Sequence, residues 1–146
     1  MEIHCDKLHL NPPVMKLEHV AIWTKDLEKL KIYYTRHFEG KANSLYTNSI
    51  TGFTSYFITF DGGARLELMH KSNIPENLND RETQQHLGII HLALAVNTRD
   101  EVDMKAEELK KAGYSILRGP RTTGDGYYEF ETLDPDGNRI EVIFRI

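Results

Sequence analysis

The chain has little of what marks secreted or membrane proteins. It has a single cysteine, Cys5, among its 146 residues, so no disulfide can form within the chain and nothing requires an oxidising compartment. No apolar run approaches the roughly 18 residues of a membrane-spanning helix, and the N-terminus lacks the basic-then-apolar pattern of a signal peptide. We therefore expect a cytoplasmic protein that does not enter membranes.

An excess of positive charge is also missing. The formal net charge is −4 and the pI is near 6.0, which argues against nucleic acid or an anionic membrane surface as a partner. Hydrophobic residues at 40% and charged residues at 27% are ordinary for a globular protein. A chain of this length is predicted to form one domain with a sizeable core.

The first residues differ from the rest of the chain. The stretch "MEIHCDKLHLNPP" has no sustained periodicity and ends in two prolines, just before a strand-like segment. His4, Cys5 and His9 could form a metal cluster. The interpretation we favour is an N-terminal arm over residues 1–14, which is mobile or contacts a second chain, followed by a single domain over residues 15–146.

An internal repeat is the most informative pattern in the sequence. The stretch "GFTSYFITFDGGARLELM" aligns without a gap with "GYYEFETLDPDGNRIEVI" at an offset of 74, which places Glu67 on Glu141. Upstream, "LEHVAIWTKDLEKL" aligns with "IIHLALAVNTRDEV" at an offset near 72, which places His19 on His91. The chain is therefore a tandem duplication, and its first module, polar connecting loop and second module are assigned to residues 15–70, 71–88 and 89–146.

Each copy predicts a strand, a helix and then three strands, so the expected fold is α+β with two tandem βαβββ modules. In the first copy, "KLEHVAIW" alternates like a strand and "DLEKLKIYYTRHF" has the apolar stripe of a helix. In the second copy, Thr98 and Glu101 have the spacing of a capping box that begins a helix. The remaining strands are expected near residues 41–46, 53–60, 64–70, 115–118, 127–133 and 139–144.

One face of each predicted sheet is left open. The helix of a module must cover one face of its strands, and in the first copy this face carries Leu66 and Leu68. Alternation places polar residues on the other face, with small alanines two positions after each histidine. The polar residues on this open, concave face are His19, Glu67, His91 and Glu141.

Two carboxylates on a half-buried face would repel each other and lose hydration unless a cation neutralised them. Imidazole and carboxylate are ligands for Zn²⁺, Ni²⁺, Co²⁺, Mn²⁺ and Fe²⁺. The alternative is that each residue is an ordinary polar strand residue, with the glutamates paired to Arg65 and Arg139. Repetition of His and Glu in both copies favours a site for one divalent metal ion.

The chain resembles the vicinal oxygen chelate superfamily, which includes glyoxalase I, extradiol dioxygenases, fosfomycin resistance transferases and bleomycin resistance proteins. The resemblance rests on "LEHVAIWTKDLEKLKIYY", "ARLELMH", "GIIHLALAV" and "GDGYYEFETLDPDGNRIEVI" and covers nearly the whole chain. It implies paired βαβββ modules that form a metal-bearing cleft. The order of metal ligands, His19, Glu67, His91 and Glu141, looks most like glyoxalase I, a lyase that uses Ni²⁺ or Zn²⁺.

The resemblance to glyoxalase I implies a reaction and a quaternary structure. The substrate would be the hemithioacetal of a small α-oxoaldehyde such as methylglyoxal with a thiol, and the product a 2-hydroxyacyl thioester. The metal would bind the two vicinal oxygens as a Lewis acid. By position, Glu141 would be the catalytic base and Glu67 its counterpart. The resemblance also implies a homodimer, in which the site is formed within one chain or between two.

Two positions depart from bacterial glyoxalase I, which typically has a glutathione-binding arginine and asparagine where this chain has Trp23 and Lys71. Another thiol, or a substrate that is not a thiol adduct, fits equally well. A metal-free drug-binding protein, a thiol transferase and an extradiol dioxygenase are the alternative functions. Residues expected to line the substrate cleft are Trp23, Met69 and Tyr128.

Overall fold

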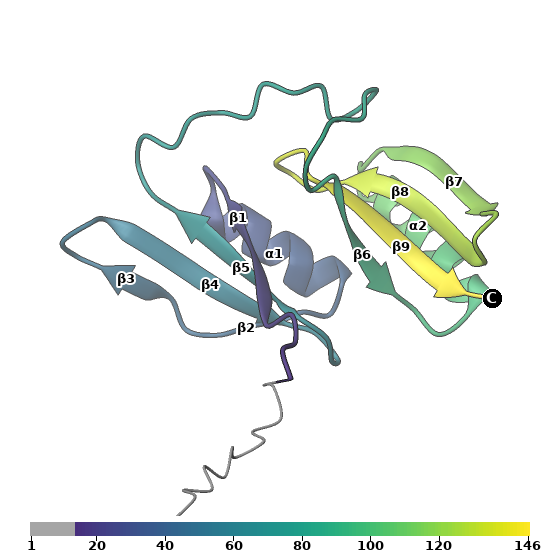
Figure 1. Cartoon of the computed structure of the whole chain (residues 1–146), viewed down its shortest axis with the longest axis horizontal. Coiled ribbons are helices and arrows are strands. Elements are labelled where there is room, and N and C mark those ends of the chain that lie inside the picture. Colours follow the sequence, from purple (N-terminus) through teal and green to yellow (C-terminus); the bar gives the residue numbers. More distant parts are fainter. Residues whose placement is uncertain (1–13) are drawn as a thin grey trace, which may run out of the picture.

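The computed structural model describes residues 14–146 (Figure 1). The three residues of the alternative N-terminal metal cluster, His4, Cys5 and His9, lie outside the described residues, as does nearly all of the expected arm. Among the described residues, no helix is long and apolar enough to cross a membrane.

The first module forms one mixed sheet with a helix on one face. Its sheet has the strand order β1-β5-β4-β2, with β3 paired to the other part of β4. Strand β1 runs parallel to β5, and the remaining pairs are antiparallel. The elements are β1 (His19–Trp23), α1 (Leu27–His37), β2 (Lys41–Ala42), β3 (Tyr46–Asn48), β4 (Phe53–Thr59) and β5 (Arg65–His70).

The second module repeats this plan. Its sheet has the order β6-β9-β8-β7, and β6 runs parallel to β9 as β1 does to β5. The expected α+β fold of two similar modules is confirmed. The elements are β6 (His91–Ala95), α2 (Arg99–Lys111), β7 (Ile116–Thr122), β8 (Tyr127–Leu133) and β9 (Arg139–Arg145).

Two strands differ from the sequence prediction. The single strand expected near residues 41–46 is two short strands, because Asn43 leaves the ladder and its side-chain Oδ1 accepts a hydrogen bond from the Phe57 backbone N–H at 2.7 Å. Strand β7 extends beyond Arg118 through a bulge at Gly119. A Cβ at Gly119 would lie 2.5 Å from the Glu129 carbonyl oxygen, so only glycine lets the strand continue here.

Local capping residues begin both helices. Asp26 caps α1 by accepting a hydrogen bond from the Lys29 backbone N–H at 3.0 Å. Thr98 and Glu101 form the predicted capping box of α2, with reciprocal side-chain-to-backbone hydrogen bonds at 3.2 and 2.9 Å. The apolar faces of the helices can therefore be placed against the sheets in a defined register.

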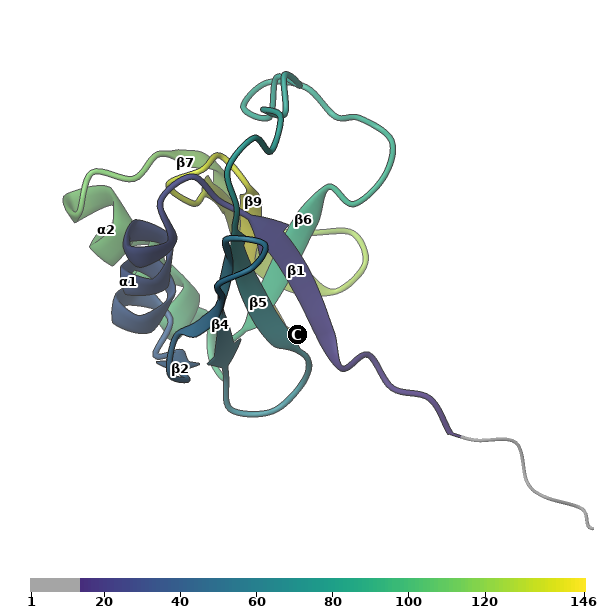
Figure 2. The ribbon, with the colours of Figure 1, turned by 90° about the vertical axis from the view of Figure 1, so that its left-hand side faces the viewer.

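Both helices lie side by side at the left of Figure 2, and strands β1, β5 and β6 lie to their right. The two modules contact each other through the helix side, where the rings of Tyr33 and Tyr114 pack with their centroids 4.9 Å apart. The Tyr34 hydroxyl donates to the Asp134 carboxylate at 2.9 Å. One core therefore spans both modules, and its fully buried apolar residues include Leu30, Tyr34, Ile58, Leu68, Val102, Leu109, Phe130 and Ile140.

Strands β1 and β6 are edge strands. Within the described residues, each pairs on one side only, with β5 and β9 respectively. They border a cavity of about 730 Å³ beneath the loop of residues 71–88, which arches over the two sheets in Figure 1. The two sheets thus remain separate, and each turns its helix-free face outward.

Candidate metal centre

In the first module, adjacent parallel strands bring His19 and Glu67 together. Ala21 of β1 is the register partner of Glu67 on β5, so His19 lies one two-residue step away on the same face. The distance from His19 Nε2 to Glu67 Oε2 is 3.7 Å, and the Glu67 side chain is only 15% exposed. These two residues form the first half-site.

Neighbouring charges orient the imidazole of the first half-site. The Glu18 carboxylate hydrogen-bonds His19 Nδ1, and this interaction holds the pKa of Glu18 below its ordinary value. The Arg65 guanidinium in turn donates from Nε to Glu18 at 2.7 Å. A carboxylate at one imidazole nitrogen fixes the ring so that the other nitrogen can bind a metal. Nε2 of His19 therefore points toward Glu67.

The second module repeats the geometry in the same register. Ala93 of β6 pairs with Glu141 of β9, and His91 Nε2 lies 3.2 Å from Glu141 Oε2. The Glu141 side chain is also 15% exposed. His91 and Glu141 form the second half-site. Two nitrogen or oxygen ligands of a tetrahedral Zn²⁺ lie about 3.4 Å apart, and the donor spacings of the two half-sites fall on either side of this value, so each pair fits a shared metal ion.

The arginines do not pair with these glutamates. Arg65 binds Glu18, and Arg139 donates to Glu131 at 2.6 Å. Within residues 14–146, the only ion-pair partners of Glu67 and Glu141 are the two histidines. The alternative explanation of the glutamates, as arginine partners, therefore has no support in the structure.

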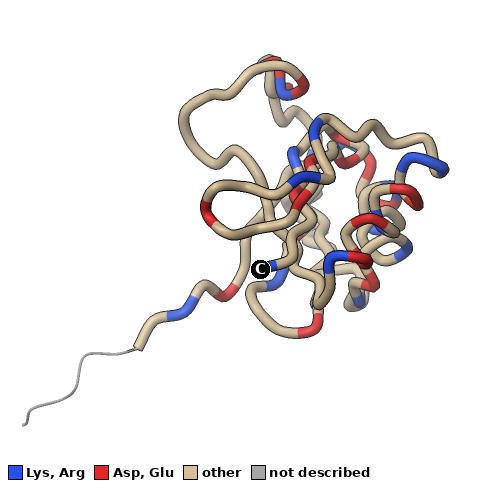
Figure 3. Tube along the Cα trace, turned by 90° about the vertical axis from the view of Figure 1, so that its right-hand side faces the viewer, with Lys and Arg blue, Asp and Glu red and all other residues tan. Residues whose placement is uncertain are grey.

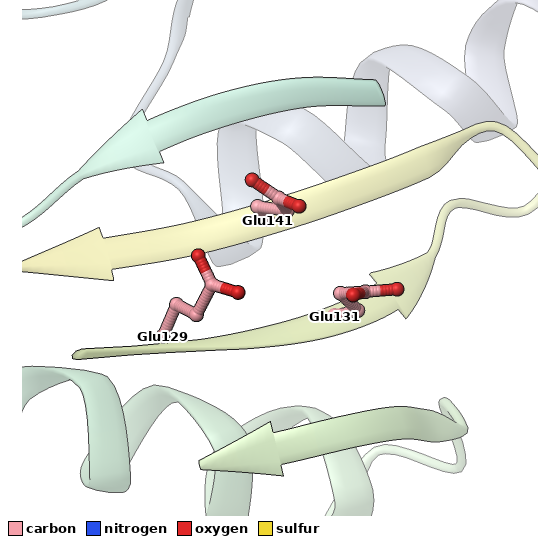
Figure 4. A group of neighbouring side chains, drawn as sticks. All are labelled: Glu129, Glu131 and Glu141. Carbon is pink, nitrogen blue, oxygen red and sulfur yellow. The ribbon is translucent and has the colours of Figure 1, made fainter. Parts of the chain in front are cut away.

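Two further carboxylates flank Glu141 (Figure 4). Glu129 and Glu131 lie on β8, and with Glu141 they offer ligand atoms that all lie within 4.8 Å of one another. Burial raises the pKa of Glu141; the carboxylates of Glu129 and Glu131 also raise it, while His91 and Arg121 oppose them. The Arg121 guanidinium donates a hydrogen bond to the Glu129 carboxylate at 3.1 Å and partly offsets this negative charge.

These two carboxylates were not predicted from the sequence, although a signal for them exists. In "YYEFETL", Glu129 and Glu131 alternate with the buried Phe130, which places both on the open face. Lys, Arg, Asp and Glu are interspersed along the trace in Figure 3, so ordinary surface charge hides such a pattern in the sequence. Here the two glutamates are 7% and 4% exposed, which is unusual for charged residues.

One chain keeps the two half-sites apart. Among residues 14–146, the only group of three or more potential metal ligands within 4.8 Å is the Glu129, Glu131 and Glu141 cluster. The first half-site therefore does not meet the second in a single chain. Each is a pair of donors on an outward sheet face, with its histidine side chain about 40% exposed.

The expected cleft residues divide between the two faces. Trp23 pairs in register with Met69, two residues beyond Glu67 on the open face. Tyr128 lies elsewhere: its hydroxyl donates to Asp103 on α2 at 2.8 Å, because it shares the helix-facing side of β8 with Phe130. The residue on the open side is its neighbour Tyr127, which lines a cavity of about 550 Å³ with His91 and Glu141.

Comparison with known families agrees with this architecture. A family model described as "Glyoxalase/Bleomycin resistance protein/Dioxygenase superfamily" matches residues 16–142. The uncharacterized protein YqjT of Bacillus subtilis (strain 168) is 35% identical over 60 residues, which cover 39% of this chain. The match spans about half of that protein, 47% of its length.

Solved structures share the fold at low sequence identity. A glyoxylase/bleomycin resistance protein/dioxygenase domain from Frankia sp. EAN1pec superposes with a TM-score of 0.74 and 20% identity, covering 92% of this chain and all of that one. The trypanothione-dependent glyoxalase I of Leishmania major superposes with a TM-score of 0.68 and 19% identity, covering 90% of this chain and 87% of that one.

Proposed function

Because the chain belongs to the Glyoxalase/Bleomycin resistance protein/Dioxygenase superfamily, we propose that it is a metal-dependent isomerase of the glyoxalase I kind. Its substrate is the hemithioacetal of a small α-oxoaldehyde with a thiol, and its product is a 2-hydroxyacyl thioester. The observation that carries the proposal is the repetition of one His–Glu pair, in identical register, on the open faces of both modules.

The donor set suits a borderline divalent ion such as Ni²⁺ or Zn²⁺. Two imidazoles and two carboxylates neutralise a 2+ charge, and both carboxylates lie on half-buried faces without an arginine or lysine partner among residues 14–146. His19, Glu67, His91 and Glu141 would hold the ion. A bound metal supplies Lewis-acid polarisation of the two adjacent substrate oxygens.

Glu141 carries the proton in this proposal. It takes the proton from the carbon that bears the hydroxyl and sulfur and returns it to the neighbouring carbonyl carbon. The hydroxyl proton passes to the former carbonyl oxygen, so that the atoms balance as an isomerisation. A base must lie within hydrogen-bonding reach of the carbon-bound proton, and a carboxylate that holds the ion beside the two substrate oxygens already does. Glu67 has Phe57 as its cross-strand neighbour and acts as a metal ligand.

We place the complete site between two chains of a homodimer. Each chain offers two half-sites that do not meet, and each lies beside an unpaired sheet edge. A twofold dimer that joins the first half-site of one chain to the second half-site of the other completes two equivalent sites at once. The proposal therefore accounts for both open half-sites with a single contact.

Mixing inactive variants tests this arrangement. His19→Ala and His91→Ala chains are each expected to be inactive alone, because every site of either homodimer lacks one ligand. After mixing and refolding, each heterodimer has one intact site and one with both lesions, so up to half of the activity per dimer should return. Confirmed heterodimers without recovery would place all four ligands in one chain and overturn the shared site.

Elemental analysis tests the metal itself. Protein purified without chelators should contain a divalent metal in stoichiometric amount, and turnover of methylglyoxal with a panel of thiols should depend on it. A protein without metal that also takes up none on titration would contradict the isomerase proposal and favour a metal-free binding protein.

A further inference from the structure

Three aromatic residues gather on the open face of the first module. Trp23 of β1 and Phe53 of β4 pack edge to face, with ring centroids 6.0 Å apart at 88°. Tyr46 of β3 adjoins Phe53 with a centroid distance of 6.1 Å. We call Trp23, Phe53 and Tyr46 the aromatic corner.

The aromatic corner is exposed. Trp23 is 41% exposed and Tyr46 is 53% exposed, although large rings are usually buried deeply. The two outer rings of the corner, Trp23 and Tyr46, thus leave part of their apolar surface open to a further group. The corner is therefore an exposed apolar surface, and a flat apolar group that covers it removes this surface from water.

The fold does not require these rings. By the register of the two modules, Ala95 stands where Trp23 stands, and Ile143 stands where Met69 stands. Tyr46 pairs with Ser55 as Arg121 pairs with Glu129, so Arg121 stands in the place of Tyr46 in the second module. The second module builds the same sheet without the corner, so sheet packing does not explain it.

The aromatic corner lies next to the first half-site. Met69, the register partner of Trp23, follows Glu67 by two residues, which is about 7 Å along a strand. Trp23 also lines the cavity of about 730 Å³ beneath the connecting loop, together with Ile74 and Pro75. A cavity of this size suits a small organic ligand, and of the three corner residues it is Trp23 that borders it, at the edge of the open face.

From this placement we infer that the substrate carries a planar aromatic group, which packs on the aromatic corner while its two adjacent oxygens lie at the half-site. The preferred aldehyde is then an aryl α-oxoaldehyde such as phenylglyoxal, in place of methylglyoxal. This inference rests on the proposed function for the reaction, but the binding of the ring can be measured without it.

The single tryptophan of the chain reports on the site directly, because all tryptophan fluorescence comes from Trp23. Mandelate and lactate are probes that share a 2-hydroxy acid and differ by a phenyl ring in place of a methyl group. Titrated into the full chain, with and without added Zn²⁺, mandelate should change the Trp23 emission at a concentration about two- to tenfold lower than lactate. Equal responses, or none, would overturn the inference.

A matched pair of variants sharpens the test while keeping the reporter. Tyr46→Ala removes the outer ring of the corner, and Ile50→Ala removes a 94%-exposed residue from the same β3–β4 hairpin. Tyr46→Ala should weaken mandelate binding about two- to tenfold and leave lactate binding unchanged, while Ile50→Ala should change neither. Equal effects of the two variants on mandelate would contradict the inference.

Two results separate this inference from the proposed function. Preferential mandelate binding by a protein that neither holds metal nor turns over adducts would support the corner and overturn the isomerase. Turnover without preference for the phenylglyoxal adduct over the methylglyoxal adduct would support the isomerase and overturn the inference about the corner. An emission that changes on protein dilution, and not with mandelate, would assign the corner to contact between chains and overturn the inference.

Discussion

The two modules hold their glutamates in the same register but surround them differently. Across the ladder from Glu67 stands Phe57, whereas the residue across from Glu141 is Glu131. Two residues earlier, on the same face of the sheet, β4 carries Ser55 and β8 carries Glu129. The first module therefore places neutral side chains on β4 across from its glutamate, whereas the second places two buried carboxylates on β8.

The histidines differ in a complementary way. His19 is oriented by Glu18, but the residue before His91 is Ile90, which has no polar side chain. Strand pairing thus preserved the ligand positions after duplication, while neighbouring positions were free to diverge. The comparison suggests a division of labour, in which the first module anchors the metal and the second supplies the reactive carboxylate.

The largest expected effect compares Glu141→Gln with Glu67→Gln. Both remove a metal anion, so metal occupancy should fall in both. Only Glu141→Gln also removes the base, so at saturating metal its kcat should stay about 10²- to 10⁴-fold below that of the natural chain. Glu67→Gln should regain most of its turnover. Elemental analysis of each sample is the control, and equal rescue of the two variants would refute the asymmetric assignment.

A smaller effect tests the anchoring role of the first module. Glu18→Gln removes the carboxylate that orients His19, so metal affinity should fall about ten- to hundredfold. Competition with a chromophoric chelator measures this affinity. Glu82→Gln, which changes an exposed glutamate of the connecting loop, is the matched control and should leave affinity unchanged. Identical affinities of Glu18→Gln and its control would show that His19 needs no orienting carboxylate.

The smallest effect concerns the contact between the modules, where His37 Nδ1 meets Glu108 at 2.8 Å. Burial acts to raise the pKa of Glu108, but hydrogen bonds from Lys105 and His37 outweigh it and lower the pKa below 4.5. Ionised Glu108 therefore stabilises the fold above pH 4.5, which is its ordinary pKa. This stability is lost as the pH falls through the lower pKa that Glu108 has in the folded chain. The side chain is 44% exposed, so solvent limits the contribution to about 0.5 kcal/mol.

Urea unfolding checks this contribution. Glu108→Gln should be less stable than the natural chain at pH 6, and the difference should disappear near pH 3. Glu107→Gln, an exposed neighbour on the same helix, should show no such pH dependence. A difference that persists at pH 3 would mean that packing, and not charge, joins the helices at this point.

Most of the fold could be predicted because its signals are local. Alternation around Leu66 and Leu68, the capping box at Thr98 and the repeated turns each require only a few neighbouring residues. Strand β3 could not be predicted, because three residues carry no periodicity and its existence depends on pairing with β4. Pairing with the next strand, and not a pattern within the three residues themselves, decides whether such an element forms.

The candidate site was predictable in its halves but not as a whole. Parallel pairing of the first and last strands brings His19 to Glu67 and His91 to Glu141, and alternation alone predicts that these residues share a face. How the two modules pack involves contacts such as Tyr34 to Asp134, which join residues 100 positions apart and which no local pattern reveals. Tyr128 illustrates the same limit, since Tyr127 and Tyr128 are equivalent until the buried Phe130 fixes which of them faces the helix.

The edge strands β1 and β6 affect how readily the chain misassembles with other chains in a crowded solution. An unpaired edge offers backbone N–H and C=O groups to any passing strand, and natural proteins keep such edges short or cover them. Both edges here are five residues long, and each carries one of the two proposed histidine ligands. Under the proposed assembly, the contact that completes the metal site brings these edges together with a partner, so selection for catalysis also selects against misassembly.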